Sequence, residues 1–254
     1  MTDSASVPAF DDGAGLEPQT GSPADRHPPP GPRGDCVETS WSAPETDHLA
    51  ILDEIPANDL GTPEAAARRS TAGLELWGGV ECTVLRVGEM WRDQLRESGH
   101  YNRIGDLDAV ARLGFSKLRY PVLWEHVAPE WPDACDWRWH DERLGRLREL
   151  GVTPIAGLVH HGGGPHYTNL LDPHFPELLA EQAGRTAQRY PWIQSWTPVN
   201  EPLTTARFSG LYGHWFPHGC DEPTFLRILV NECRAVRSAC SASIAGKFGS
   251  SRLV

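Results

Sequence analysis

The sequence predicts an α/β fold in which strands and helices alternate around a parallel sheet. Three observations support this fold class. Four apolar, strand-like segments are each followed by a segment with helical spacing, which implies parallel strands joined by right-handed crossovers. The strand-like segments are apolar at nearly every position, as expected where both faces of a sheet are covered. Polar residues able to do chemistry stand at the carboxyl ends of several strands.

The expected elements alternate regularly along the chain. Strands are expected at 74–85, 116–124, 152–161 and 191–199, and helices at 106–114, 139–151, 176–190 and 222–236. Leu144, Leu147 and Leu150 share one face of the second helix. Gly114 and Gly151 stand where the first two helices should end, because glycine readily takes the left-handed conformation that closes a helix.

The residues at the strand ends favour a barrel over an open sheet. They are Glu81, Arg119, His160, His161, Asn200 and Glu201. In a (β/α)8 barrel of the TIM type, the carboxyl ends of the strands form the active-site face. Four strand–helix units make up half of such a barrel, so the prediction is an incomplete TIM barrel over 71–254. An open, flavodoxin-like sheet is the alternative, and without a Gly-x-Gly-x-x-Gly after the first strand the dinucleotide-binding variant is not supported.

The first part of the chain differs in composition from the rest. Residues 1–60 hold twelve acidic residues, two arginines and nine of the 22 prolines. We therefore predict a disordered acidic, Pro-rich arm over 1–70. There is no signal peptide and no apolar run of about eighteen residues, so a cytoplasmic protein without a membrane partner is expected. Without a basic patch or a CxxC pair, neither nucleic acid nor a metal or other cofactor is expected.

Five stretches resemble signatures of family 1 glycoside hydrolases, the β-glucosidase group. In chain order they are LWGGVECT (76–83), LRYPVLWEHVAP (118–129), LRELGVTPIAGLVHHGGGP (147–165), SWTPVNEP (195–202) and GLYGHWFPHGCD (210–221). They are similar to the first, second and third barrel strands, the acid/base motif that ends the fourth strand, and the loop after it. Arg119, Trp124 and Pro129 fall in register with the second-strand signature. The resemblance covers about residues 74–236, in the family's order.

The resemblance implies retaining hydrolysis of β-linked glycosides, which needs a carboxylic acid and a nucleophilic carboxylate about 5–5.5 Å apart. It makes Glu201 the general acid/base, kept partly protonated by burial and by the neighbouring carboxylate. Asn200 would bind the sugar 2-hydroxyl, His160 a ring hydroxyl, and Arg119 would orient the nucleophile. Trp124 would offer an aromatic face to the sugar, with plain core packing as the alternative.

The sequence also departs from the family pattern. Leu85 stands at the position of a sugar-binding Gln, His161 replaces a Trp, and His126 replaces an Arg. Three glycines at 162–164 predict a flexible loop. With these departures the chain resembles divergent barrels that are fused to a sugar-nucleotide reductase domain. Such a domain is therefore a candidate partner, and polysaccharide biosynthesis a candidate setting.

The family's nucleophile has no counterpart in the sequence. It is a Glu at the end of the seventh strand, and no Thr-Glu-Asn-Gly-like stretch occurs here. No element is expected after about residue 237, where the apolar periodicity stops. A truncated or frame-shifted product lacking a C-terminal half is therefore suspected. Glu81 and Glu125 are the carboxylates near strand ends that could substitute, and the expected geometry favours neither.

Two functional hypotheses follow. The first is an O-glycosyl hydrolase of the β-glucosidase type, or its N-terminal half, with Glu201 as acid/base. The second is a non-catalytic carbohydrate-binding or scaffolding half-barrel. Both have a carbohydrate as substrate or ligand.

Overall fold

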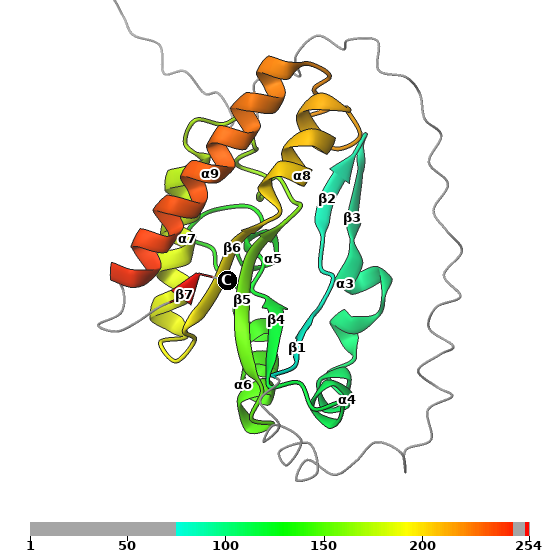
Figure 1. Cartoon of the computed structure of the whole chain (residues 1–254), viewed down its shortest axis with the longest axis vertical. Coiled ribbons are helices and arrows are strands. Elements are labelled where there is room, and N and C mark those ends of the chain that lie inside the picture. Colours follow the sequence, from blue (N-terminus) through cyan, green and yellow to red (C-terminus); the bar gives the residue numbers. More distant parts are fainter. Residues whose placement is uncertain (1–74, 246–251, 254) are drawn as a thin grey trace, which may run out of the picture.

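The computed structural model describes residues 75–245 and 252–253, which form a parallel five-stranded sheet with flanking helices (Figure 1). The strand order is β1-β4-β5-β6-β7. These strands are Trp77–Gly79, Lys117–Pro121, Thr153–His160, Ser195–Asn200 and Arg252–Leu253. Every neighbouring pair is parallel. The α/β prediction is therefore confirmed, while the arm predicted over 1–70 lies outside the described residues.

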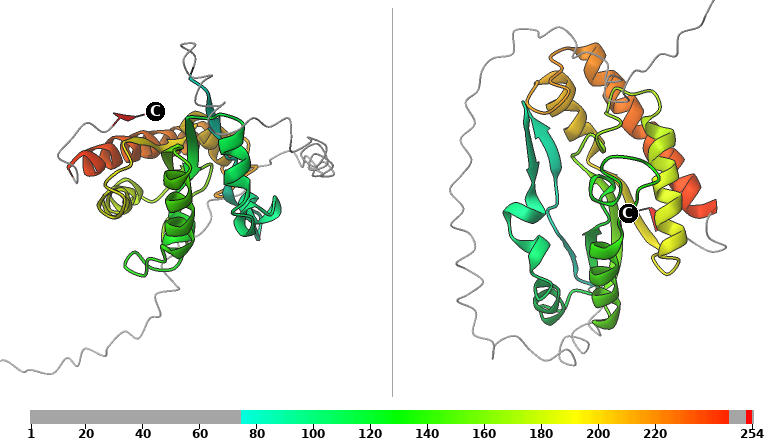
Figure 2. Two further views of the ribbon diagram at one scale, coloured as in Figure 1. Left: turned by 90° about the horizontal axis from the view of Figure 1, so that it is seen from below. Right: turned by 180° about the vertical axis from the view of Figure 1, so that it is seen from behind.

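Crossover helices connect the successive strands. They are α4 (Asp106–Arg112), α6 (Arg138–Glu149), α7 (Phe175–Arg189) and α9 (Glu222–Ala245). Gly114 and Gly151 follow α4 and α6 with φ of 84° and 72°, as predicted for helix-closing glycines. Seen from below, α6, α7 and α9 lie on the same side of the sheet (Figure 2). None of the helices described is long and apolar enough to cross a membrane.

Helix α9 continues beyond the end at residue 236 that the sequence predicts. The segment 237–245 contains neither Gly nor Pro, so nothing in it stops a helix. Its small residues weaken the apolar periodicity, yet Ala239 is fully buried, and a Cβ on Gly184 of α7 would lie 4.0 Å from that of Ala242. Strand β7 follows and pairs with the start of β6, a fifth strand that the sequence interpretation missed.

The single strand expected at 74–85 is divided in the structure. Strand β1 ends at Gly79, and Val84–Val87 forms β2, which pairs antiparallel with β3 (Met90–Asp93) outside the main sheet. Gly88 has φ of 58° in the tight turn, a conformation that favours a two-residue hairpin. Asp93 then caps α3 (Gln94–Glu97) by accepting hydrogen bonds from the N–H groups of Leu95 and Arg96.

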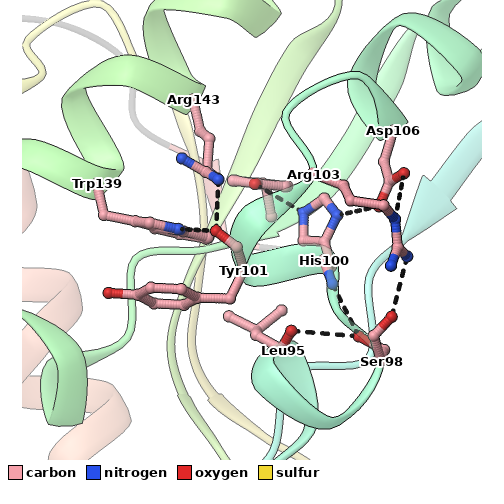
Figure 3. A network of polar contacts seen from close by, with 9 residues as sticks. Leu95, Ser98, His100, Tyr101, Arg103, Asp106, Trp139 and Arg143 are labelled. Atoms are coloured by element: carbon pink, nitrogen blue, oxygen red, sulfur yellow. Dashed lines mark hydrogen bonds and ion pairs between the residues drawn. The ribbon is translucent and has the colours of Figure 1, made fainter.

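A polar network connects the segment that follows the hairpin to α4, β4 and α6 (Figure 3). In the short helix η3 (His100–Asn102), His100 Nδ1 lies 2.8 Å from Asp106 Oδ2 in α4, and its Nε2 lies 2.9 Å from the Tyr120 hydroxyl in β4. The carbonyl of Tyr101 accepts a 2.8 Å hydrogen bond from Trp139 Nε1 in α6. These contacts hold His100 and Tyr101 against α4, β4 and α6.

Candidate active site

Six side chains meet at the carboxyl ends of β1, β4, β5 and β6. We call them the strand-end cluster: Glu81, Arg119, His160, His161, Asn200 and Glu201. They converge because the strands are parallel and in register, with His160 opposite Asn200. Four of the five site residues expected from the sequence, Arg119, His160, Asn200 and Glu201, therefore lie together.

Asn200 is the centre of the strand-end cluster. Arg119 Nη1 donates a 2.6 Å hydrogen bond to its Oδ1, so its Nδ2 points toward the two histidines. That nitrogen lies 3.3 Å from His160 Nε2 and 3.1 Å from His161 Nε2. Asn200 is only 5% exposed, so its amide is held in one orientation by these partners.

Glu81 is the first-strand residue that reaches the cluster. Its carboxylate oxygens lie 3.2 Å from His160 Nε2 and 3.8 Å from Arg119 Nη2, and its side chain is 69% exposed. The Val80 N–H donates to the Arg119 carbonyl and thereby extends the β1–β4 pairing up to Glu81. Leu85, which the resemblance matched to the family's sugar-binding Gln, lies instead on β2.

Glu201 leaves the end of β6 in a strained conformation. Its φ of 47° and ψ of 62° are left-handed, and Pro202 starts α8 (Pro202–Ala206) directly after it. Such backbone strain in a non-glycine residue is found preferentially at functional sites. The Glu201 side chain is 61% exposed, with one carboxylate oxygen 3.7 Å from His161 Nε2. The burial expected for Glu201 is therefore wrong for the described part of the chain.

The two histidines act as neutral hydrogen-bonding groups. Burial, reinforced by the neighbouring His161, lowers the pKa of His160 to about 4. Burial also lowers the pKa of His161 below its ordinary value. His161 has φ of 57°, and its Nδ1 lies 3.0 Å from the Thr205 hydroxyl in α8. Near pH 7 the cluster can therefore offer imidazole donors and acceptors to a polar ligand.

A cleft of about 180 Å³ adjoins the cluster through His161. It is lined by Leu85, Arg86, Trp91, His161, Gly163, Gly164, Pro165, His166, Thr168, Asn169, Trp215 and Phe216. Trp91 comes from the β2–β3 hairpin, while Trp215 and Phe216 follow the π-helix η4 (Arg207–Leu211). Aromatic rings beside hydrogen-bonding groups suit a sugar, whose ring has apolar faces and polar edges. Sequence reasoning missed these aromatic residues because the cleft depends on how hairpin and loop meet.

Trp124 lies apart from the strand-end cluster. It begins the short helix α5 (Trp124–Val127) and is 1% exposed. Its Nε1 donates a 2.8 Å hydrogen bond to the Tyr167 hydroxyl, and its ring packs against Phe175 at a centroid distance of 5.7 Å. The structure thus places Trp124 in the core, as the alternative interpretation of the sequence had it.

Glu125 is buried behind the glycine loop at 162–164. Its Oε1 accepts a 3.3 Å hydrogen bond from the Gly164 N–H, and Oε2 has no hydrogen-bond partner in the described part of the chain. Burial raises the pKa of Glu125 to about 7. A Cβ on Gly162 would lie 2.1 Å from Oε1. Gly162 is therefore required here for close packing, and the flexibility expected of the glycine loop stays a prediction.

Glu125 is thus separate from the strand-end cluster, while Glu81 belongs to it. Among the residues that the structure describes, no group of three or more His, Cys, Asp or Glu side chains is arranged to hold a metal ion.

Comparison with known proteins gives partial matches to β-glucosidases. No protein-family model matches the sequence. Beta-glucosidase 4 of Oryza sativa subsp. japonica is 26% identical over 135 aligned residues, and the match covers 49% of this chain and 28% of that protein. Probable inactive beta-glucosidase 14 of the same plant is 24% identical, with 49% and 26% covered. Beta-glucosidase 44 of Arabidopsis thaliana is 22% identical, with 46% and 24% covered. The matches span about a quarter of each relative.

Solved structures give the same result for the fold. The family 1 β-glucosidase from Thermotoga maritima superposes with a TM-score of 0.53 at 21% identity, covering 61% of this chain and 37% of that one. Its complex with glucoimidazole gives a TM-score of 0.55 at 20% identity, with the same coverage. The chain therefore resembles a divergent part of a family 1 glycoside hydrolase. Its described residues form a partial (β/α)8 barrel, which confirms the fold class predicted from the sequence.

Proposed function

We propose that the chain provides the acid/base side of a retaining β-glycosidase site that acts on O-glycosidic bonds. The single observation that supports it best is the convergence of Glu201, Asn200, His160 and Arg119 at one edge of the sheet. In this proposal a sugar binds at the cluster, with its ring edges toward Asn200 and His160 and an apolar face toward the aromatic cleft.

In the proposed reaction, Glu201 first acts as an acid. Its carboxylic acid donates a proton to the glycosidic oxygen as the bond to the leaving group breaks, while a second carboxylate attacks the anomeric carbon. The Glu201 carboxylate then takes a proton from the water that hydrolyses the glycosyl intermediate. Exposure of the Glu201 side chain gives it access to both a leaving group and water.

The proposed reaction also needs a second carboxylate as its nucleophile. Glu81 is the other carboxylate of the cluster, and it contacts His160 and Arg119. Glu125 is buried behind the glycine loop, with the Gly164 N–H on one oxygen. In this proposal the nucleophile comes from a further part of a barrel, because the family resemblance places it at the end of the seventh strand. The second candidate, carbohydrate binding without catalysis, is favoured by the placement of these two carboxylates, and one of the relatives is itself named probable inactive.

Glu201→Gln tests the proposal and separates the two candidates. If Glu201 is the acid/base, turnover of methyl β-D-glucopyranoside by the natural gene product, which in this proposal also supplies the nucleophile, should fall by about 10²–10⁴-fold, because general acid–base catalysis has this size. The loss should be smaller for 4-nitrophenyl β-D-glucopyranoside, whose leaving group needs less protonation. Initial rates with both substrates measure this.

The matched control is Glu222→Gln, an exposed glutamate at the start of α9, which should leave both rates unchanged. Binding of the glucoside measured by calorimetry, with no turnover and no effect of Glu201→Gln, would instead establish the non-catalytic candidate.

A further inference from the structure

Cys82 makes a buried contact with the strand-end cluster that the proposed reaction does not use. It directly follows Glu81, is 2% exposed and is a free thiol. Its Sγ lies 3.2 Å from His160 Nδ1. Val84, Leu95 and Leu123 surround it in a small apolar cluster, so no solvent competes for this contact. Burial raises the pKa of the Cys82 thiol, which therefore keeps its proton and can donate it.

The other ring nitrogen of His160 faces an acceptor. Nε2 lies 3.2 Å from Glu81 Oε2, and an ionised carboxylate can only accept hydrogen bonds. A proton on Nε2 makes this contact a hydrogen bond, whereas a lone pair there would face the carboxylate. The neutral ring has one proton, so Nδ1 is then the acceptor, and the thiol is the donor that faces it.

Asn200 Nδ2 contacts both histidines and is nearer to His161, at 3.1 Å from His161 Nε2 and 3.3 Å from His160 Nε2. At His160 Nε2 the Glu81 carboxylate at 3.2 Å is the stronger partner, because a hydrogen bond to an ionised acceptor outweighs one from a neutral amide. Because Arg119 donates to Oδ1, Asn200 Nδ2 is a donor, and His161 Nε2 at 3.1 Å can accept from it. His161 then has its proton on Nδ1, where it can donate to the Thr205 hydroxyl at 3.0 Å. The adjacent histidines are thus opposite tautomers, each determined by its own partner.

We propose that Cys82 is a positioning residue that holds His160 in the tautomer with its proton on Nε2. The cluster then presents a fixed N–H donor beside the Glu81 acceptor, a pair matched to a sugar hydroxyl that accepts and donates at once. That the ligand is a sugar rests on the proposed function. The tautomer itself is a property of the free protein.

The tautomer can be measured directly by ¹⁵N NMR of the imidazole rings, with the His160 signals assigned from their loss in His160→Gln. We expect protonated Nε2 and unprotonated Nδ1 in the full chain at pH 7. Cys82→Ala should populate the Nδ1–H form, because the donor to Nδ1 is gone and an unprotonated Nε2 can accept from Asn200 Nδ2 at 3.3 Å. Cys82→Ser keeps a donor and should retain the original tautomer. A wild-type ring protonated on Nδ1, or a Cys82→Ala spectrum identical to wild type, would overturn the proposal.

Calorimetry with methyl β-D-glucopyranoside then tests the consequence. Cys82→Ala should weaken binding roughly two- to tenfold, the usual effect of one net hydrogen bond, and Cys82→Ser should restore most of it. Equal loss in both variants would indicate a packing role and contradict positioning. If the wild-type protein does not bind the glucoside, the proposed function fails, while the NMR result still decides the tautomer.

Discussion

Trp124→Ala will lower the free energy of unfolding by about 3–5 kcal/mol, the range for removing a large aromatic side chain from a core. Trp124 is among the largest fully buried side chains, and it packs between Tyr167 and Phe175. The substitution also leaves the Tyr167 hydroxyl without the indole N–H that donates to it. Urea denaturation followed by circular dichroism measures the loss.

Trp91→Ala is the matched control for this prediction. Trp91 is 47% exposed and lines the cleft, with its ring 4.8 Å from that of His166. We expect little change in stability and weaker binding of methyl β-D-glucopyranoside. A stable Trp124→Ala protein that no longer binds the glucoside would contradict the core role of Trp124. It would indicate that Trp124 binds the sugar.

The free energy of unfolding of the wild-type protein will fall as the pH rises from 4.5 to 7, and Glu125→Gln will abolish the part of this fall that Glu125 causes. The pKa of the Glu125 carboxyl is about 7 in the folded chain, against an ordinary value of 4.5. Between these two values the folded state binds one more proton than the unfolded state, so stability falls with rising pH. The stabilisation from protonated Glu125 is fully present below pH 4.5 and is lost by pH 7. The free energy of unfolding falls by about 3 kcal/mol in total over this range. Urea midpoints at pH 4.5, 6 and 8 measure it.

Gln has nearly the shape of the protonated Glu and stays neutral, so the variant should be more stable than wild type at pH 8. Glu232 of α9 contributes in the same direction, because burial raises its pKa well above the ordinary value. The effect of Glu125 is therefore the difference between wild-type and Glu125→Gln curves, which leaves the Glu232 part unchanged. Glu130→Gln, an exposed glutamate that contacts His166, controls for loss of a carboxylate. Parallel wild-type and Glu125→Gln curves would contradict the prediction.

Much of the candidate site could be expected from short stretches of sequence. Asn200 and Glu201 end an apolar run, and parallel strands place such ends side by side. Glu81 and Arg119 were expected at strand ends for the same reason. The resemblance matched Leu85, and not Glu81, to the family's sugar-binding Gln. The reason is that the apolar run 74–85 continues from the first strand into the hairpin. Local periodicity does not distinguish a long strand from a short strand and a hairpin.

The sequence by itself determined the alternation of strands and helices, the parallel direction of the strands, and which polar residues stand at the strand ends. Each of these depends on neighbours within one element, where period and turn residues are decisive. Only the tertiary structure decided that Trp124 belongs to the core, that Glu201 is exposed and that Cys82 contacts His160. These properties depend on contacts between residues such as 82 and 160, which strand register and helix packing bring together across distant parts of the chain.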